Sequence, residues 1–110
     1  IDWPINKKFV KAIKDKYGAA RVVGDPMQCG YNSVYLWKSA VEKAKSFAPD
    51  DVIKASAGLE IEAPEGVVRF DQENHHVWKK VRVGRALADG QFEIVHETAD
   101  LVKPDPFPKL

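Results

Sequence analysis

The chain has 110 residues, which is enough for one domain with a modest core. Hydrophobic residues make up 45% and charged residues 30% of it, a balance that is typical of a globular chain and excludes a disordered one. The 17 basic and 16 acidic residues leave a net charge of +1, so we expect no nucleic-acid partner. Cys29 is the single cysteine and cannot form an internal disulfide. No apolar run approaches the ~20 residues that span a bilayer.

The first part of the chain, residues 1–58, is predicted to be helical, with helices at about 6–17, 25–46 and 49–57. In the first helix, Asn6 is a suitable N-cap and apolar residues then recur at helical spacing, so that one stripe is buried. The third helix begins at a proline and carries two aspartates in its first turn, near the positive end of the helix dipole.

The second helix has the strongest predicted start in the chain. Asp25 suits the N-cap, Pro26 suits the first helical position, and Gln28 suits the third as a capping-box partner. The apolar face that follows is too wide for a helix lying on one side of a small core. It predicts a helix that is buried on two sides.

Residues 59–110 are predicted to form a β segment, because the hydrophobic period changes from helical to two. Residues 67–70 read as a strand. Asp89-Gly90 is the preferred dipeptide of a type I′ turn, and the alternating residues on both sides of it predict a β-hairpin. The tail at 103–108 is rich in proline and should be extended. The two parts together are expected to make one domain or a partial domain.

Metal binding and catalysis are both weakly indicated. His75 and His76 follow acidic residues, but neighbouring residues of a strand point to opposite faces and would not converge on one ion. His96 is a possible base and Cys29 a possible nucleophile, yet no glycine elbow, Ser-His-Asp arrangement or phosphate-binding loop surrounds them. We therefore expect no catalytic residue, no metal and no cofactor, and a chain that is not an enzyme.

The start of the second helix is the best candidate for binding a small ligand. A helix N-terminus offers unpaired N–H groups and a positive partial charge, which suit a carbonyl group or an anion. Asp25, Met27 and Gln28 lie at this start, and Tyr31 one turn later could add a hydroxyl. The alternatives are plain helix capping for the first three residues and a core position for the tyrosine.

Several motifs together resemble one protein family. They are APEG at 63–66, ENHH at 73–76, VRVG at 81–84, ADGQFEIV at 88–95 and PDPFP at 104–108. This combination is similar to the urea- and short-amide-binding branch of the type I periplasmic binding proteins. The helical stretch INKKFVKAIKDKYGAARVVGDPMQCGYNSVYLWKSAVEKAKSF is similar to the late helical part of the same family, although Cys29 stands where a small residue such as alanine is expected.

The resemblance implies an α/β fold, as the C-terminal segment of a bilobal protein that holds its ligand in the cleft between two lobes. It implies a receptor for urea or a short amide in an ABC importer, with permease subunits as partners and a periplasmic or extracellular location at the membrane. It carries a cleft-wall role over to Asp25–Tyr31. Two alternatives stay open: a cytoplasmic amide sensor that regulates amidase expression, and a receptor of the branched-chain amino-acid type.

The chain begins Ile-Asp-Trp-Pro, without methionine or an apolar leader, and we interpret it as a fragment. Separated from its parent, it should expose the faces that Phe9, Tyr35, Trp37 and Phe92 normally bury. Large apolar patches favour self-association, so we expect a homo-oligomer or a domain swap. We also expect no measurable ligand binding by the isolated piece.

Overall fold

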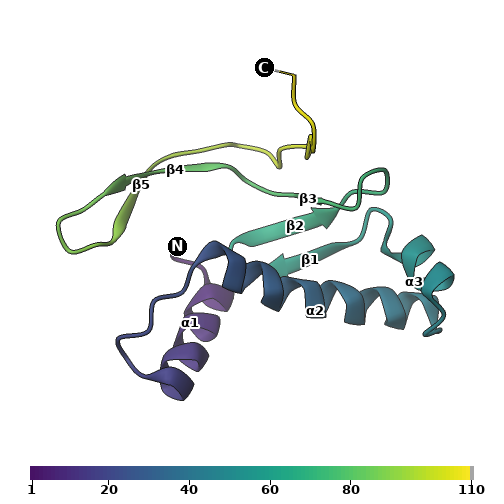
Figure 1. The fold of residues 1–110 in the computed structure, drawn as a ribbon, viewed down its shortest axis with the longest axis horizontal. Coiled ribbons are helices and arrows are strands. Elements are labelled where there is room, and N and C mark those ends of the chain that lie inside the picture. The colour runs from purple at the N-terminus through teal and green to yellow at the C-terminus, as the bar shows by residue number, and fades with distance from the viewer. Residues whose placement is uncertain (110) are drawn as a thin grey trace.

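The computed structural model describes residues 1–109 and shows three helices followed by five strands (Figure 1). The helices are α1 (Pro4–Tyr17), α2 (Asp25–Ala44) and α3 (Pro49–Ser56), and the strands are β1 (Glu60–Ala63), β2 (Gly66–Phe70), β3 (Val77–Trp78), β4 (Arg82–Ala86) and β5 (Phe92–Glu97). The α/β class predicted from the sequence is confirmed. Within residues 1–109, none of the helices combines the length and the apolarity needed to cross a bilayer.

The start of α1 differs from the prediction. The helix begins at Pro4, two residues before the predicted N-cap Asn6, and Trp3 takes the extended N-cap conformation. Proline suits the first helical position because it lacks the N–H that would be unpaired there. Asn6 lies inside the first turn, and its Nδ2 donates to the carbonyl oxygen of Ile1 at 2.9 Å.

The ends of α2 also require correction. Gly24 is the N-cap, so Asp25 is the first helical residue, and no side chain caps this helix end. The helix ends at Ala44 and not at the predicted Ser46, because Lys45 takes the left-handed conformation with φ 54°. In the same way α3 ends at Ser56, one residue before the predicted Ala57.

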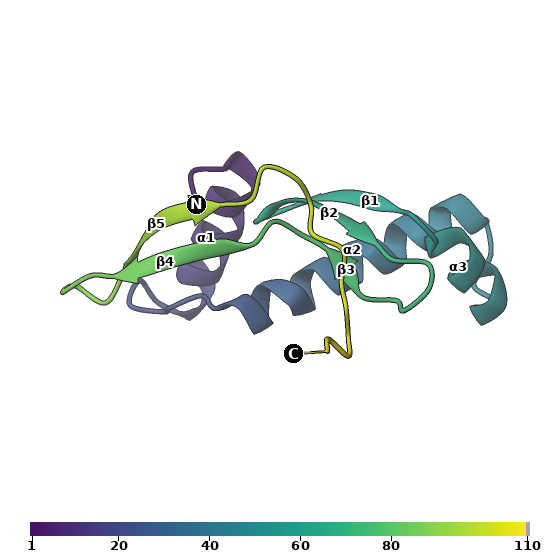
Figure 2. The same ribbon diagram turned by 90° about the horizontal axis from the view of Figure 1, so that it is seen from above.

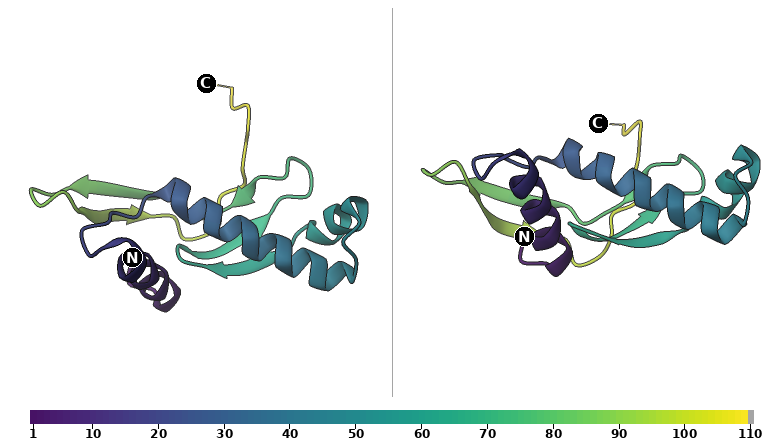
Figure 3. Two further views of the ribbon diagram at one scale, coloured as in Figure 1. Left: turned by 60° about the horizontal axis from the view of Figure 1, so that its bottom comes forward. Right: turned by 90° about the horizontal axis from the view of Figure 1, so that it is seen from below.

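The core lies where the helices meet a three-stranded antiparallel sheet of order β1-β2-β3. Its buried apolar side chains are Phe9 of α1, Ala40 of α2, Ala63 of β1 and Val68 of β2. Since α2 runs along one face of this sheet (Figures 2 and 3), one side of the helix is covered. The other side is exposed, including Val34, Tyr35 and Trp37, so within residues 1–109 the helix is covered on one side only.

The predicted hairpin is confirmed as β4–β5, but its turn is of another type. A type I′ turn needs positive φ at both central residues. Only Gly90 has it, with φ 79°, and the loop spans the three residues 88–90. The N–H of Gly90 donates to Leu87 O at 3.1 Å, and the N–H of Leu87 donates to Gln91 O at 2.9 Å. A three-residue loop that ends in a left-handed glycine follows the twist of the strands equally well.

The loop between β2 and β3 is organised by Asp71, whose side chain is buried. Its carboxylate accepts the N–H groups of Glu73 at 2.8 Å and Asn74 at 3.0 Å, and the indole N–H of Trp78 at 2.7 Å. Asn74 Nδ2 in turn donates to the carbonyl oxygen of Pro104 at 3.2 Å, which holds the proline-rich tail against this loop. The loop and the tail therefore form one hydrogen-bonded unit.

The neighbouring histidines each have a structural contact. The ring of His75 stacks on Phe70, with centroids 5.7 Å apart, and Nδ1 of His76 lies 2.9 Å from the carbonyl oxygen of Asn74. Between residues 1 and 109, no group of three or more His, Cys, Asp or Glu residues is arranged to hold a metal ion.

We expect Asp71→Asn to destabilise the fold in a pH-dependent way. The N–H of Asn74, followed by those of Glu73 and Trp78, holds the pKa of Asp71 below its ordinary value of 3.8. A carboxylate with a lowered pKa stabilises the folded chain above its unfolded pKa, and this contribution is lost as the pH falls through the folded value. The difference between wild type and variant should therefore be full at pH 7 and should shrink below pH 3.8.

Thermal unfolding followed by circular dichroism at several pH values measures this difference. Asp100→Asn is the matched control, because Asp100 is exposed. A destabilisation by Asp71→Asn that is the same at pH 7 and in acid would contradict the role given to the carboxylate.

Candidate functional site

A hollow of about 850 Å³ lies between the helices and the β4–β5 hairpin. Its walls come from α1, the link between α1 and α2, the first turn of α2, the segment 79–82 and β5. Figures 1 and 3 show the hairpin extending from the sheet towards the end of the molecule where α1 lies. Apolar side chains such as Phe9, Val22, Phe92 and Ile94 line one part of the hollow. Asp25, Gln28, Glu65, Lys79 and Arg82 contribute its polar part.

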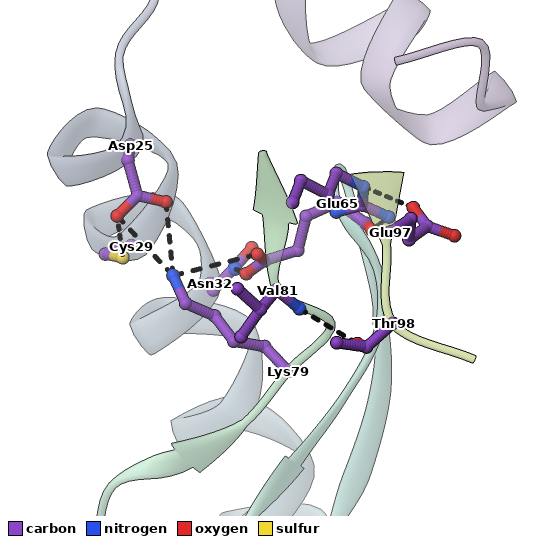
Figure 4. Close-up of polar contacts among 9 residues, drawn as sticks. Asp25, Cys29, Asn32, Glu65, Lys79, Val81, Glu97 and Thr98 are labelled. Atoms are coloured by element: carbon purple, nitrogen blue, oxygen red, sulfur yellow. Dashed lines mark hydrogen bonds and ion pairs between the residues drawn. The ribbon is translucent and has the colours of Figure 1, made fainter. Parts of the chain in front are cut away.

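Lys79 connects two carboxylates at the polar end of the hollow (Figure 4). Its Nζ lies 3.3 Å from Oδ1 of Asp25 and 3.8 Å from Oε2 of Glu65. Glu65 is only 7% exposed, and this burial raises the pKa of its carboxyl while the Lys79 cation opposes the rise. Burial lowers the pKa of Lys79, but the two carboxylates outweigh it and the net shift is upward. The cluster thus joins the first turn of α2 to the β1–β2 turn.

Two amide side chains beside Glu65 have buried polar atoms without a partner within residues 1–109. Asn32 is 6% exposed, and its Nδ2 donates to Oε1 of Glu65 over a long 3.5 Å, but its Oδ1 has no partner. Nε2 of Gln28 is also buried and makes no hydrogen bond of normal length, although the Gln28 amide lies near enough to Glu65 to lower the pKa of that carboxyl. A buried polar group without a hydrogen bond costs about 1–3 kcal/mol, so such groups are uncommon in folded proteins. One free acceptor and one amide donor therefore lie close to the same carboxylate.

Arg82 ties the hairpin to this cluster. Its Nη2 donates to the backbone carbonyl of Glu65 at 2.9 Å, and its Nε pairs with the carboxylate of Glu97. Lys80 also pairs with Glu97, at 3.0 Å. The hydrogen bond from Lys80, followed by that from Arg82, holds the pKa of Glu97 below its usual value. The cations of segment 79–82 are thus already matched by carboxylates within the chain.

The four predicted ligand-binding residues divide into two pairs. Asp25 and Gln28 line the hollow, whereas Met27 and Tyr31 are not part of its lining. Tyr31 packs between Phe9 and Tyr35, with ring centroids 4.7 and 4.6 Å away. Its hydrogen bond with Tyr35 and its burial raise the pKa of Tyr31 to about 12. Tyr31 is thus half-buried against these two rings, and ligand binding by the four residues stays a prediction.

Three residues of the cluster were not among the predicted site residues. Glu65 and Lys79 are 14 residues apart in the chain and belong to no common local pattern. Asn32 carries the one available signal, because it is a polar residue on the side of a helix that otherwise buries apolar residues.

Cys29 lies on the first turns of α2, with its Sγ 3.9 Å from Oδ2 of Asp25. Burial, followed by the Asp25 carboxylate, raises the pKa of this thiol. A raised pKa favours the thiol over the thiolate, which is the nucleophilic form. The geometry therefore gives Cys29 no activation as a nucleophile.

The fold is similar to parts of two solved solute-binding proteins. A solute-binding protein of an ABC transporter from Rhodopseudomonas palustris BisB5, solved in complex with 3,4-dihydroxybenzoic acid, is similar over 94% of this chain and 29% of its own, with 25% identity and a TM-score of 0.77. A second one, from R. palustris HaA2 in complex with p-hydroxybenzoic acid, is similar over 96% and 29%, with 27% identity and a TM-score of 0.67.

The family profile described as periplasmic binding protein domain matches residues 1–110, and the chain belongs to this family. A curated relative, called limonene hydroxylase, from Geobacillus stearothermophilus is 27% identical over 106 residues. That match covers 96% of this chain and 19% of the relative. The chain thus spans about a fifth of that protein and less than a third of the two solved ones.

Proposed function

We propose that this chain is part of the substrate-binding component of an ABC importer, and that the hollow is one wall of its ligand cleft. The ligand that the geometry favours is a small, polar, neutral molecule: urea or a short amide. Family membership and the similarity to two solute-binding proteins of ABC transporters support the general role. The observation that carries the ligand class is the amide cluster beside Glu65: Oδ1 of Asn32 is buried without a partner, and the buried amide of Gln28 lies near the Glu65 carboxylate.

These atoms match the hydrogen-bonding groups of an amide. Urea and primary amides present one carbonyl acceptor and several N–H donors. Nε2 of Gln28 would donate to the carbonyl, while the carboxylate of Glu65 would accept an N–H group. So small a ligand has little apolar area to bury, and its affinity must come from several such convergent hydrogen bonds.

The charges around the hollow favour a neutral ligand. Lys79, Lys80 and Arg82 are all paired with Asp25, Glu65 or Glu97. An anionic ligand would have to compete with these carboxylates, and a cationic one would have to displace Lys79. A neutral molecule can add its hydrogen bonds without breaking an ion pair.

A second candidate is a hydroxylated aromatic acid, because both solved relatives were crystallised with one. Two cations on the rim, Lys14 and Arg21, line the hollow and form no ion pair within residues 1–109. They could face a carboxylate, with Phe9 and Phe92 available to the aromatic ring. The two ligand classes thus use different parts of the same hollow.

The proposal includes no chemical step. The chain would bind and present its ligand to permease subunits in the periplasm or outside the cell. The name of the Geobacillus relative describes a protein of which this match covers only 19%. A catalytic role would need a group activated for reaction, and the geometry of the cluster gives Cys29 no such activation.

Calorimetric titration of the gene product that carries this sequence, at its natural length, tests the proposal. We expect heat of binding with urea or acetamide, and none with leucine. Gln28→Leu should weaken the binding at least tenfold, a loss of about 1.4 kcal/mol, because the donor to the ligand carbonyl is gone. Gln72→Leu is the matched control on the exposed surface. Heat with p-hydroxybenzoic acid and none with any amide would replace the first ligand class by the second.

A further inference from the structure

The ammonium group of Lys79 lies where carboxylate oxygens from two other elements converge (Figure 4). Its Nζ is 3.3 and 3.5 Å from the two carboxylate oxygens of Asp25, and 3.8 Å from Oε2 of Glu65. Asp25 belongs to the first turn of α2 and Glu65 to the turn between β1 and β2, whereas Lys79 follows β3. All three residues line the hollow. The chain therefore places a cation of its own at the polar end of the hollow.

Contacts other than the lysine also hold these acceptors in place. Glu65 is only 7% exposed, and Nδ2 of Asn32 donates to its second oxygen, Oε1, at 3.5 Å. Nη2 of Arg82 donates to the backbone carbonyl of Glu65 at 2.9 Å, which anchors the turn. Oδ1 of Asn32 is buried without a partner within residues 1–109 and adds a surplus acceptor beside the same carboxylate. Without the lysine, the fold would still present a preformed cluster of oxygen acceptors.

The charges at this end of the hollow balance only when the lysine is present. The ion pairs join three cations to three carboxylates: Lys79, Lys80 and Arg82 to Asp25, Glu65 and Glu97. Glu97 engages two of the cations. Within residues 1–109, Lys79 alone forms ion pairs with Asp25 and Glu65. The rim cations Lys14 and Arg21 are exposed, so water and salt screen their charge. Loss of Lys79 would leave one excess negative charge at the polar end.

We infer that Lys79 determines the charge of the ligand, because the polar end of the hollow is a cation site that the chain fills with its own lysine. The inference rests on the proposed function of the hollow as a ligand-binding wall. While Lys79 is present, a cationic ligand would meet a like charge at close range, which is strongly unfavourable. Such repulsion lets a site reject one of two ligands of similar shape.

The chemistry of the acceptors defines the cation that would bind in the absence of the lysine. Two carboxylates offer pairs of oxygen atoms, and a planar group with several N–H donors matches such pairs. A guanidinium or an amidinium ion has this form. Replacing Lys79 by a neutral residue should therefore change the ligand class from small neutral amides to small planar cations.

Urea and guanidinium are suitable probes, because both are planar, similar in size and rich in N–H donors, and they differ in charge. Each is titrated by calorimetry into the gene product at its natural length, at constant ionic strength and about pH 8, well above the ordinary pKa of a carboxyl group. Millimolar guanidinium chloride is far below the molar range that unfolds proteins. We expect the wild type to bind urea and to reject guanidinium. Lys79→Met should bind guanidinium at least about tenfold more tightly than the wild type does.

Four further variants identify the cause of the gain. Lys80→Met is the matched control, because Lys80 also lines the hollow but pairs with Glu97, which keeps Arg82 as a partner. It should gain no affinity for guanidinium, and neither should Lys79→Arg, which retains the cation. Lys79→Gln should gain affinity, and it covers the case in which the methionine variant does not fold, because its amide can still donate to Glu65. Adding Glu65→Gln to Lys79→Met should remove the gain.

Three results would overturn the inference: a wild type that binds guanidinium as tightly as urea, no guanidinium binding by either neutral Lys79 variant, or an equal gain in Lys80→Met. The first comparison needs no variant and so does not depend on how the variants fold. Each of these results leaves the proposed function intact if the wild type binds urea. Conversely, a wild type that binds no amide contradicts the proposed function, while a gain of guanidinium binding by the Lys79 variants would still support the cation site.

Discussion

Replacing Phe9 by alanine should lower the free energy of unfolding by about 3–4 kcal/mol, the largest effect that we expect from a single substitution in this chain. Phe9 is the one large aromatic residue in the buried core, and its ring lies 4.7 Å from that of Tyr31. Removing the ring leaves a cavity where α1 meets α2. A loss of this size is severe for a small domain, because total stabilities are only about 5–15 kcal/mol.

Unfolding by guanidinium chloride measures this loss. Phe107→Ala is the matched control, because Phe107 is exposed in the tail, and it should change the stability by less than about 0.5 kcal/mol. A similar midpoint for the two variants would mean that α1 contributes little to the core. It would also mean that α1, which lines the hollow, is not held firmly in place by Phe9.

The importance of Phe9 differs from what the sequence predicted. Phe9 was expected among the apolar residues exposed in this chain, together with Tyr35, Trp37 and Phe92, and for Phe9 that expectation is wrong. The other three are exposed as predicted. Helical spacing identifies the stripe to which Phe9 belongs, but it cannot say whether the surface that covers the stripe lies within the chain. Here Tyr31, 22 residues later, covers it.

The local signals of the sequence were reliable where one short stretch decides the structure. Asp89-Gly90 located the hairpin, although the turn is longer than predicted. The two shortest features were not recognised: β1, of sequence Glu-Ile-Glu-Ala, and the two-residue β3. Neither is long enough to show a period, and both are defined by their hydrogen bonds to β2.

The candidate site depends even more on contacts between distant parts of the chain, which local sequence signals cannot predict. Asp25 and Gln28 were found because they occupy a helix start, which is a local feature. Lys79 contacts Asp25 and Glu65, which lie 54 and 14 residues before it, and only the folded chain brings the three together. Long-range clusters of this kind have no characteristic spacing in the sequence. The sequence therefore predicted the helix start as a candidate site but not the buried carboxylate of Glu65.

Lys79→Met is expected to destabilise the fold by about 1–2 kcal/mol at neutral pH. Removing one partner of a fully buried ion pair costs about 3–5 kcal/mol, because the other charge is left without compensation. Here the effect is smaller, since Lys79 is one third exposed and water screens part of the interaction. Lys38→Met is the matched control: Lys38 pairs with Glu42 on the exposed surface of α2, and its loss should cost less than about 0.5 kcal/mol.

The pH dependence identifies Glu65 as the cause of the destabilisation. Burial holds the pKa of Glu65 above its ordinary value of 4.5, so the folded chain keeps a proton that the unfolded chain has released. This carboxyl therefore destabilises the fold increasingly as the pH rises through that window. Without the Lys79 cation the pKa of Glu65 in the folded chain should rise further, so this pH window should extend upward. The stability lost in Lys79→Met should therefore be largest near pH 7 and become smaller towards pH 4.5.

A double variant, Lys79→Met with Glu65→Gln, separates this cause from a general packing defect. If the buried charge is responsible, the neutral glutamine should restore much of the lost stability and remove the pH dependence, so the two substitutions would be strongly non-additive. Denaturant unfolding of the wild type, both single variants and the double variant from about pH 4.5 to pH 8 gives the coupling at each pH. Additive losses that do not change with pH would show that Glu65 carries no uncompensated charge in the hollow.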